Sequence, residues 1–244
     1  MAILAEAEQR AGQLSARVRV TTELHVGSRI PKLLDASRYG QLLVIGRETR
    51  TGSQRFLFGA TTAAVVARST VPTCVIPAHW TADPNPGRVV VGLRAAEHTD
   101  ELLQAAFGAA TAHAANIEVV HAWKMPDPYI DGIEYRDHAT TWMAAGAEII
   151  ERALSPWRTR YPDVPVAVRV LHEQPARALL TAAEGATLLL LLRRPTPKLL
   201  GPHLGSTART VIGAAPCPVN VLPHPQHQQE SIDLELERSG ALLR

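Results

Sequence analysis

The chain contains an internal repeat. Residues 33–77 align without gaps to residues 179–223, at a constant offset of 146 positions (223 − 77). An offset of this size is one domain length, which indicates a tandem duplication and not a solenoid of short repeats. We therefore expect two domains, 1–80 and 87–223, followed by a polar tail, 224–244. The matched pairs are Gly59/Gly205, Thr61/Thr207, Val65/Val211, Pro72/Pro218, Val75/Val221 and Pro77/Pro223.

The second copy alternates apolar strand patterns with amphipathic helix patterns. Such alternation predicts an α/β domain, a parallel sheet covered by helices on both faces, with right-handed crossovers. A doubly wound sheet of this kind has the strand order 3-2-1-4-5. The expected strands are 88–93, 117–123, 164–172, 187–192 and 217–223, and the expected helices are 98–115, 140–161, 175–186 and 205–215. A polar loop is expected at 124–138.

The first copy is incomplete. Residue 1 aligns with residue 147, so the chain starts inside the second helix of the copy, without the first two strands. The remaining third strand, 17–24, would then have to pair with the strand at 42–46, or edges would stay unpaired. We expect residues 1–80 to be poorly stable alone. An alternative is that the natural protein starts upstream of Met1.

Composition narrows the class of protein. A net charge of +2 over 244 residues, with scattered Lys and Arg, gives no electrostatic reason to expect nucleic acid as a partner. The longest apolar run, 187–192, is far shorter than the ~20 residues of a membrane span, so no membrane partner is expected. The first 18 residues mix acidic and apolar side chains, unlike a signal peptide, which predicts a cytoplasmic protein. Cys74 and Cys217 are not repeated and are interpreted as buried apolar residues.

Three common catalytic motifs are missing from the sequence. There is no nucleophile elbow, no H-E-x-x-H and no C-x-x-C, and His224 and His227 in the tail lack a third metal ligand nearby. Four carboxylates at 127–137 are interpreted as a solvated acidic loop. Tryptophans in the second copy are expected to pack or to contact a partner; these are Trp123, Trp142 and Trp157. No catalytic residue and no metal site is predicted.

A glycine-rich loop joins a strand to a helix within residues 44–68. Glycines allow close backbone approach to a phosphate, and amides at a helix N-terminus bind anions. The loop contains Gly46, Gly52 and Gly59, together with Arg47, Arg50 and Arg55. The helix would begin with Ala60 and Thr61. This arrangement is typical of a phosphate-binding turn.

These residues resemble the universal stress protein family in its tandem bacterial form. The family pattern is a glycine after strand four, then G-x2-G-x9-G-[ST], and a closing strand like CPVxVVP. In copy one Gly46 and Gly59 match, while Thr49 and Ala60 depart from the pattern; residues 71–77 and 215–223 fit the closing strand. The resemblance implies a Rossmann-like, adenine nucleotide alpha hydrolase-like fold with a parallel five-stranded sheet in two tandem copies, the first lacking its first two strands.

Copy two keeps only part of the nucleotide motif. Leu192 and Pro195 replace the first two glycines, whereas Gly205, Ser206 and Thr207 keep the helix end. Prolines in the loop lack N–H donors, and basic side chains could supply charge instead; a solvated basic loop is the alternative. The prolines are Pro195, Pro197 and Pro202, and the basic residues are Arg193, Arg194, Lys198 and His203.

The resemblance also locates the base and ribose. The family's first strand resembles VVVGVDGS, with an Asp that contacts the nucleotide, and the corresponding VVVGLRAA keeps Gly92 but puts Arg94 at the Asp position. Arginine accepts no hydrogen bonds from ribose hydroxyls or the adenine amine. His121 stands where the family lines the adenine pocket, although a core histidine is an equal alternative.

The sequence thus predicts a stress-response regulatory module, non-enzymatic, with ATP as the implied cofactor and a damaged ATP motif. A weak ATPase and a purely structural dimerisation module are the alternatives. By resemblance, the apolar closing strands pair across a two-fold axis, either in a homodimer or within the chain as a pseudo-dimer. The protein partners cannot be identified from the sequence.

Overall fold

The structure is a computed structural model that describes residues 2–14, 18–47, 60–83, 85, 87–94, 99–124, 128–194 and 203–224. Both predicted loops, 48–59 and 195–202, lie outside these residues. The predictions for Gly52 and Gly59, for Arg50 and Arg55 and for the tail beyond His224 therefore fall outside the described part of the chain. Within it, no helix is both long and apolar enough to cross a membrane.

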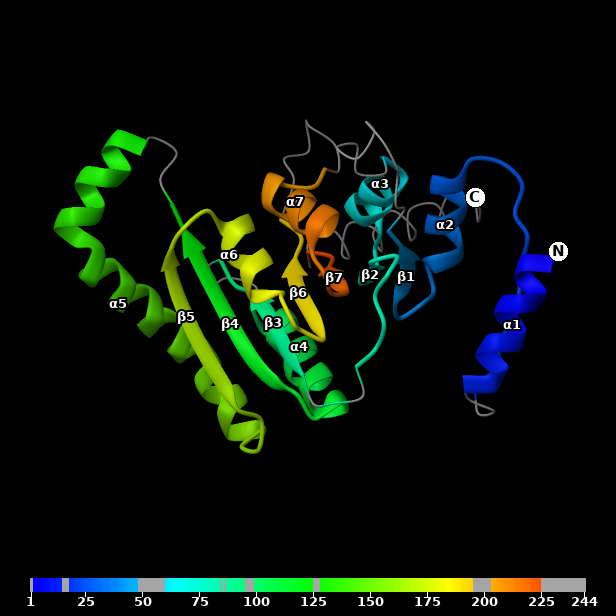
Figure 1. The fold of residues 1–244 in the computed structure, drawn as a ribbon, viewed down its shortest axis with the longest axis horizontal. Helices are drawn as coiled ribbons and strands as arrows, with labels where there is room; N and C mark the ends of the chain where they lie inside the picture. Colours follow the sequence, from blue (N-terminus) through cyan, green and yellow to red (C-terminus); the bar gives the residue numbers. More distant parts are fainter. Residues whose placement is uncertain are drawn as a thin grey trace, which may run out of the picture.

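Seven strands form one sheet in the order β1-β2-β7-β6-β3-β4-β5 (Figure 1). The strands are β1 (Leu43–Gly46), β2 (Thr73–Ile76), β3 (Arg88–Gly92), β4 (Asn116–Trp123), β5 (Val166–His172), β6 (Leu188–Leu192) and β7 (Val219–Leu222). The helices are α1 (Ala2–Leu14), α2 (Arg29–Ser37), α3 (Ala60–Arg68), α4 (Asp100–His113), α5 (Pro128–Arg160), α6 (Pro175–Ala182) and α7 (Ser206–Ala214). Every neighbouring pair is parallel except β2 and β7.

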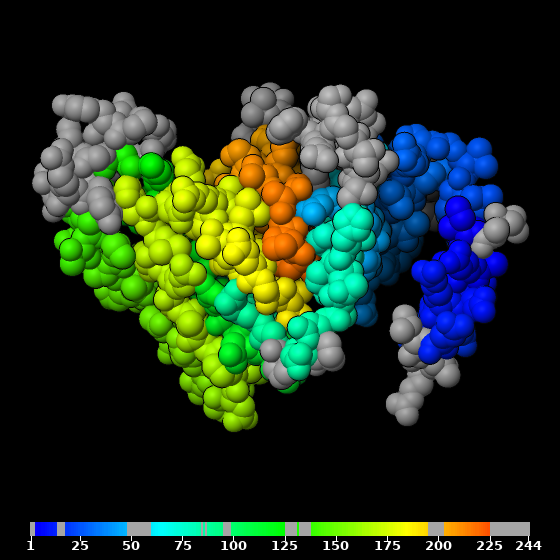
Figure 2. Space-filling view, viewed as in Figure 1, coloured from blue at the N-terminus to red at the C-terminus, as the bar shows by residue number. Residues whose placement is uncertain are grey.

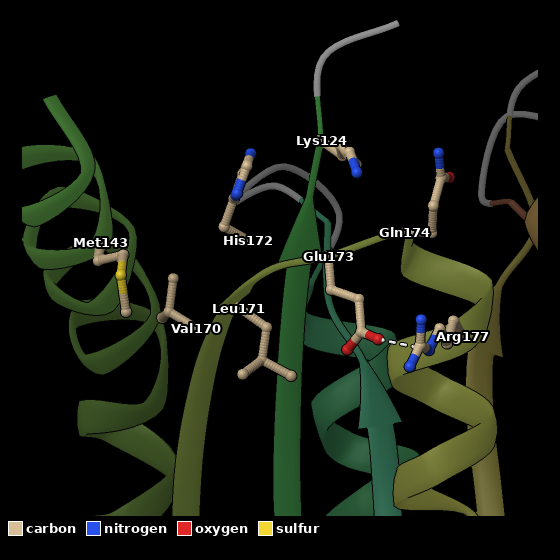
Figure 3. Close-up of a pocket in the computed structure, with 8 residues that line it drawn as sticks. All are labelled: Lys124, Met143, Val170, Leu171, His172, Glu173, Gln174 and Arg177. Carbon is tan, nitrogen blue, oxygen red and sulfur yellow. Dashed lines mark ion pairs between the residues drawn. The ribbon is translucent and has the colours of Figure 1, made fainter. Parts of the chain in front are cut away.

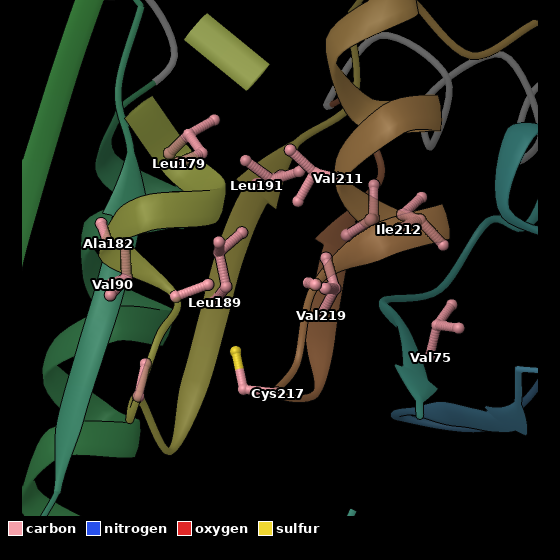
Figure 4. Packing of buried hydrophobic residues seen from close by; sticks show 14 of the residues in the cluster. Val75, Val90, Leu179, Ala182, Leu189, Leu191, Val211, Ile212, Cys217 and Val219 are labelled. Carbon is pink, nitrogen blue, oxygen red and sulfur yellow. The ribbon is translucent and has the colours of Figure 1, made fainter. Parts of the chain in front are cut away.

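The second half of the chain has the predicted architecture. Its strands run β5-β4-β3-β6-β7, which confirms the order 3-2-1-4-5. Apolar side chains project from both faces of the central strands, because helices cover both faces. One apolar cluster joins the sheet to α4 and α5, and includes Phe107 and Leu154. The other joins it to α6 and α7, and includes Leu189 and Val211 (Figure 4).

The first half differs from the prediction in two ways. It contributes only β1 and β2, and these extend the sheet of the second half where a separate sheet was expected. Residues 18–26, expected to contain a third strand, are not a strand. The physical reason is the strand order: a third strand pairs only with a second one, and the described residues of the first half include no such strand. β1 therefore forms the edge of the sheet.

The closing strands β2 and β7 join the halves. They pair antiparallel, with Thr73 opposite Val221 and Val75 opposite Val219. Of the two alternatives left open by the sequence, pairing within the chain is the one present. The bounds of α3 and α7, and those of β2 and β7, differ by the same 146 positions as the sequence repeat (219 − 73).

The prediction of a polar loop at 124–138 is wrong for residues 128–138, which are helical. Helix α5 begins at Pro128 and continues to Arg160. Proline fits the first turn of a helix, where its missing N–H costs nothing, and an acidic residue there is favoured by the helix dipole. Asp131 supplies that acid, and it is buried instead of solvated.

Candidate functional site: the carboxyl edge of β3 and β6

The carboxyl ends of β3 and β6 lie side by side in the middle of the five parallel strands. From this point the chain leaves β3 toward α4 and leaves β6 toward α7, so the crossovers diverge here. In doubly wound sheets ligands bind at such a switch point. Arg94 follows β3, and Arg193 and Arg194 follow β6. Gly205 is the N-cap of α7 and has an extended backbone.

Arg194 lies near the start of α7 and feels the charge of Arg94. Burial, and secondly the charge of Arg94, lower the pKa of Arg194. A Cβ atom added to Gly205 would lie 3.8 Å from Cδ of Arg194, so this side chain runs close to the N-cap. The Arg194 side chain therefore runs beside the positive end of a helix dipole, and the like charge of Arg94 acts on it. This electrostatic arrangement favours an anion.

The other predicted residues of copy two lie around the same edge. Ser206 and Thr207 form the first turn of α7. Nδ1 of His121 lies 2.9 Å from the backbone oxygen of Leu93, and because a carbonyl only accepts, this nitrogen donates. His121 is half-buried against Gly146 of α5. The hydrogen bond fits the core-histidine alternative, and it leaves the adenine-pocket role of His121 a prediction.

Gly92 serves packing in this structure. A Cβ atom at Gly92 would lie 2.7 Å from Cδ2 of Leu191 and 3.0 Å from Cδ2 of Leu179. Both distances are shorter than ordinary van der Waals contact. The glycine thus lets α6 approach the sheet beside the candidate site.

The predicted residues of copy one that the structure describes form no common site with those described in copy two. Gly46 ends β1, and Ala60 and Thr61 begin α3. In the sheet, β2 and β7 lie between β1 and β6. The two sets therefore stand at separate strand ends, and neither completes the other.

Two arginines expected to hold phosphate have another role. Nη1 of Arg193 donates to the carbonyl oxygens of Val66, at 2.9 Å, and Ser69, at 2.8 Å, at the end of α3. Nη1 of Arg47 donates to those of Ile212, at 3.1 Å, and Ala215, at 2.9 Å, at the end of α7.

We call these four hydrogen bonds the reciprocal arginine contacts. All three positions of one contact recur in the other at the repeat offset (193 − 47, 212 − 66 and 215 − 69 all equal 146). The acceptor residue types differ, which does not matter because the acceptors are backbone oxygens. Each arginine caps the helix of the opposite half, where unpaired carbonyls favour a cation. Sequence reasoning missed this role, although the alignment of Arg47 with Arg193 was a visible signal.

A separate open pocket of about 510 Å³ lies at the carboxyl ends of β4 and β5 (Figure 3). It contains none of the predicted site residues. Glu173 and Arg177 on its wall form an ion pair of 2.9 Å. The lining residues are Lys124, Met143, Val170, Leu171, His172, Glu173, Gln174 and Arg177.

Aromatic packing surrounds this pocket. Nε2 of His172 lies 2.7 Å from Oδ1 of Asp131, and the His172 ring lies 4.5 Å from that of Trp123. Trp123 in turn meets Trp142 edge to face, with ring centroids 5.1 Å apart. Trp157 stacks on Phe107 in the core. The three tryptophans, each half-buried, therefore pack against other aromatic rings of the domain. Of the two expectations, packing or contact with a partner, this is the first.

Comparisons with known proteins agree with this architecture. The sequence model of the universal stress protein family matches residues 86–223. The universal stress protein Rv1996 of Mycobacterium tuberculosis is 30% identical over 234 residues, which cover 93% of this chain and 70% of that protein. Rv2005c of the same organism is 29% identical over 207 residues, covering 84% and 69%.

A solved structure shares the fold. A universal stress protein from Archaeoglobus fulgidus superposes with a TM-score of 0.67 at 20% identity, covering 91% of this chain and 75% of that one. The strand order and the site at the switch point define a doubly wound, Rossmann-like α/β protein. The family match and the identity to Rv1996 make the assignment specific: the chain belongs to the universal stress protein family.

Proposed function

We propose that this chain is a non-enzymatic regulatory module of the stress response, which acts through protein partners in the cytoplasm. In it the family's nucleotide site is reduced to a site for phosphate-type anions. The observation that carries this proposal is the Arg194 side chain beside the N-cap of α7, with the charge of Arg94 acting on it.

The chemistry of these residues supports an anion over a nucleoside. Arg94 provides donors only, so it pairs with phosphate oxygens but accepts nothing from a ribose or an adenine amine. Nδ1 of His121 already donates its proton to the backbone oxygen of Leu93, so it is not free to bind a base. The edge thus offers charge for phosphate and little selectivity for a base.

The same residues support a non-enzymatic role. Phosphoryl transfer from ATP normally needs a carboxylate to hold Mg²⁺ beside the phosphates. The described positions at this edge, 93–94, 193–194 and 203–207, hold no Asp or Glu. Their charged side chains are three arginines, with His203 beside them.

Calorimetric titration of the full chain with ATP, tripolyphosphate and adenosine tests the anion site. We expect ATP and tripolyphosphate to bind with affinities within about threefold of each other, and adenosine not to bind. Arg94→Ala and Arg194→Ala should both weaken tripolyphosphate binding, whereas Arg177→Ala, at the other pocket, should not. No binding of either polyphosphate would refute the anion site.

The second candidate is an ATP-binding protein with weak ATPase activity. Ser206 and Thr207 at the start of α7 favour it, because their hydroxyls and amides suit a nucleotide phosphate. ATP binding more than about tenfold tighter than tripolyphosphate binding would favour this candidate. Mg²⁺-dependent phosphate release from ATP that Ser206→Ala abolishes would contradict the non-enzymatic proposal.

A further inference from the structure

Two segments that frame the candidate anion site are held by the first half of the chain. Arg194 follows Arg193, whose Nη1 donates to the carbonyl oxygen of Val66 in α3, at 2.9 Å. Gly205, the N-cap of α7, follows Leu204, which is 4% exposed. Leu204 belongs to the apolar cluster that also contains Val66. Each residue beside the site therefore adjoins a residue that is bonded to α3 or buried in the same cluster.

Arg193 is fixed through both its backbone and its side chain. Its amide donates to the carbonyl oxygen of Leu222 in β7, at 2.8 Å, while its guanidinium is bonded to the end of α3. The residue is 5% exposed, and its Nε is buried with no hydrogen-bond partner among the described residues. The described acceptors of this buried cation are neutral backbone oxygens. A negative charge nearby would stabilise it, and more strongly in a buried setting than in water.

We propose that occupation of the anion site and docking of the first half onto the second are coupled through Arg193, so that each favours the other. This inference rests on the proposed anion site. In the docked state α3 and β2 pack on the second half, and Figure 2 shows the orange segment with α7 lying against the blue and cyan first half. In the open state α3 and β2 have separated from it. Arg193 is a positioning residue, because it acts on the anion through Arg194.

The docked state should bind the anion more tightly than the open state. In the docked state the residues before Arg194 and Gly205 are held, so less conformational freedom is lost when a ligand binds. A ligand that prefers the docked state must stabilise it by the same factor, because such coupling is reciprocal. The opposite sign would result if Arg193, once released from α3, bound the anion directly. The experiment distinguishes the two signs.

Hydrogen exchange of the full chain tests the coupling, with and without saturating tripolyphosphate at equal ionic strength. The informative amides are those of α3 and β2 that exchange faster than the amides of β3 in the free chain, because they report opening of the first half alone. We expect tripolyphosphate to slow their exchange on the order of 10-fold. Unchanged or faster exchange overturns the coupling. So does a free chain in which both halves open only together.

Two variants at matching positions of the repeat locate the coupling. Arg193→Met removes the link between Arg194 and α3, so tripolyphosphate should then slow the exchange by less than about twofold. Arg47→Met also removes contacts between the halves, at Ile212 and Ala215, but it leaves that link in place, and the slowing should persist. Equal responses of the two variants would overturn the role of Arg193. If Arg193→Met does not fold, Arg193→Lys, which keeps the charge without the fork, replaces it with the same expectation.

Calorimetric titration of the same samples separates this inference from the proposed function. If tripolyphosphate does not bind the full chain, the anion site is refuted and the coupling with it. If tripolyphosphate binds and the first half still exchanges at an unchanged rate, the anion site stands and the coupling alone is overturned. Tripolyphosphate binding together with slower exchange in the parent chain and in Arg47→Met, but not in Arg193→Met, supports both.

Discussion

Arg193 is a buried cation held by backbone oxygens. Burial lowers the pKa of its guanidinium to about 10, yet the group remains charged at neutral pH. Its two acceptors lie at the carboxyl end of α3, where the helix dipole favours positive charge. Arginine suits this place because its planar fork presents several donors in fixed directions, which lysine does not.

Replacing Arg193 by Met should lower the free energy of unfolding by about 2–3 kcal/mol, because two buried carbonyl oxygens lose a charged donor. Arg47→Met should act in the same direction by less, since Arg47 is only half-buried. Urea unfolding at pH 7 measures both. Arg177→Met, at a largely exposed ion pair, is the control and should cost under about 0.5 kcal/mol. Equal losses for Arg193 and Arg177 would contradict the reciprocal contacts.

The two cysteines make stability depend on pH. Burial raises the pKa of Cys74 and of Cys217 to about 11, from an ordinary value of 9.0. Between these values an unfolded thiol loses its proton while the folded thiol keeps it. The free energy of unfolding should therefore fall as pH rises from about 9 to about 11.

Alkaline unfolding curves of the parent chain and of a Cys74→Val, Cys217→Ala variant test this dependence. The variant should show the shallower loss of stability, since other titrating groups are common to both chains. Ellman's reagent at pH 8 should react much faster with the urea-unfolded chain than with the folded one. Rapid labelling of the folded chain would contradict the burial of the thiols.

The roles of individual residues were the hardest feature of this protein to predict from its sequence. The repeat aligned Arg47 with Arg193, but their acceptors lie 165 and 127 positions away in the chain, at Ile212 and Val66. Which carbonyls they reach depends on how β2 and β7 pair. The phosphate role expected for both rested on their charge, whereas the structure places Nη1 of each on carbonyl oxygens at a helix end.

At the scale of the elements, a substitution at Gly92 distinguishes a role in packing α6 against the sheet from a role in binding. Gly92→Ala should lower the free energy of unfolding by about 1–3 kcal/mol, because the new methyl group crowds Leu191 and Leu179. Urea unfolding measures this cost. Tripolyphosphate affinity should stay within about threefold of the parent value. A Gly92→Ala chain of unchanged stability and lost affinity would instead place this glycine in the binding site.

Strands and helices followed from the sequence wherever local pattern and tertiary context agree. The apolar runs of β3 and β6 predicted central strands, since both faces are covered. Two segments failed for opposite reasons. Residues 128–138 look polar, yet Asp131 pairs with a distant His172 and is buried in a helix. Residues 18–26 have a strand pattern but no partner strand.

At the scale of the whole molecule, the first half depends on the second. Val66, Ala67 and Val75 belong to an apolar cluster made mainly of second-half residues. A separate polypeptide of residues 1–80 would expose them and leave β2 unpaired on the side that faces β7. We expect it to show no cooperative thermal transition by circular dichroism, whereas the full chain melts cooperatively. A sharp melt of residues 1–80 would contradict this dependence.

The β2–β7 junction is held together by a short tether as well as by contacts. Residues 77–87 connect β2 to β3 and so hold the two halves close together. The effective concentration of one half around the other is then about millimolar, a level that a separate fragment would have to reach in solution. A protease site inserted at the exposed residues 81–83 turns this junction into a bimolecular complex. After cleavage, the melting temperature of the complex should fall when the protein is diluted. The melting temperature of the intact chain should not change on dilution. The linker thus makes the stability of the intact chain independent of its concentration.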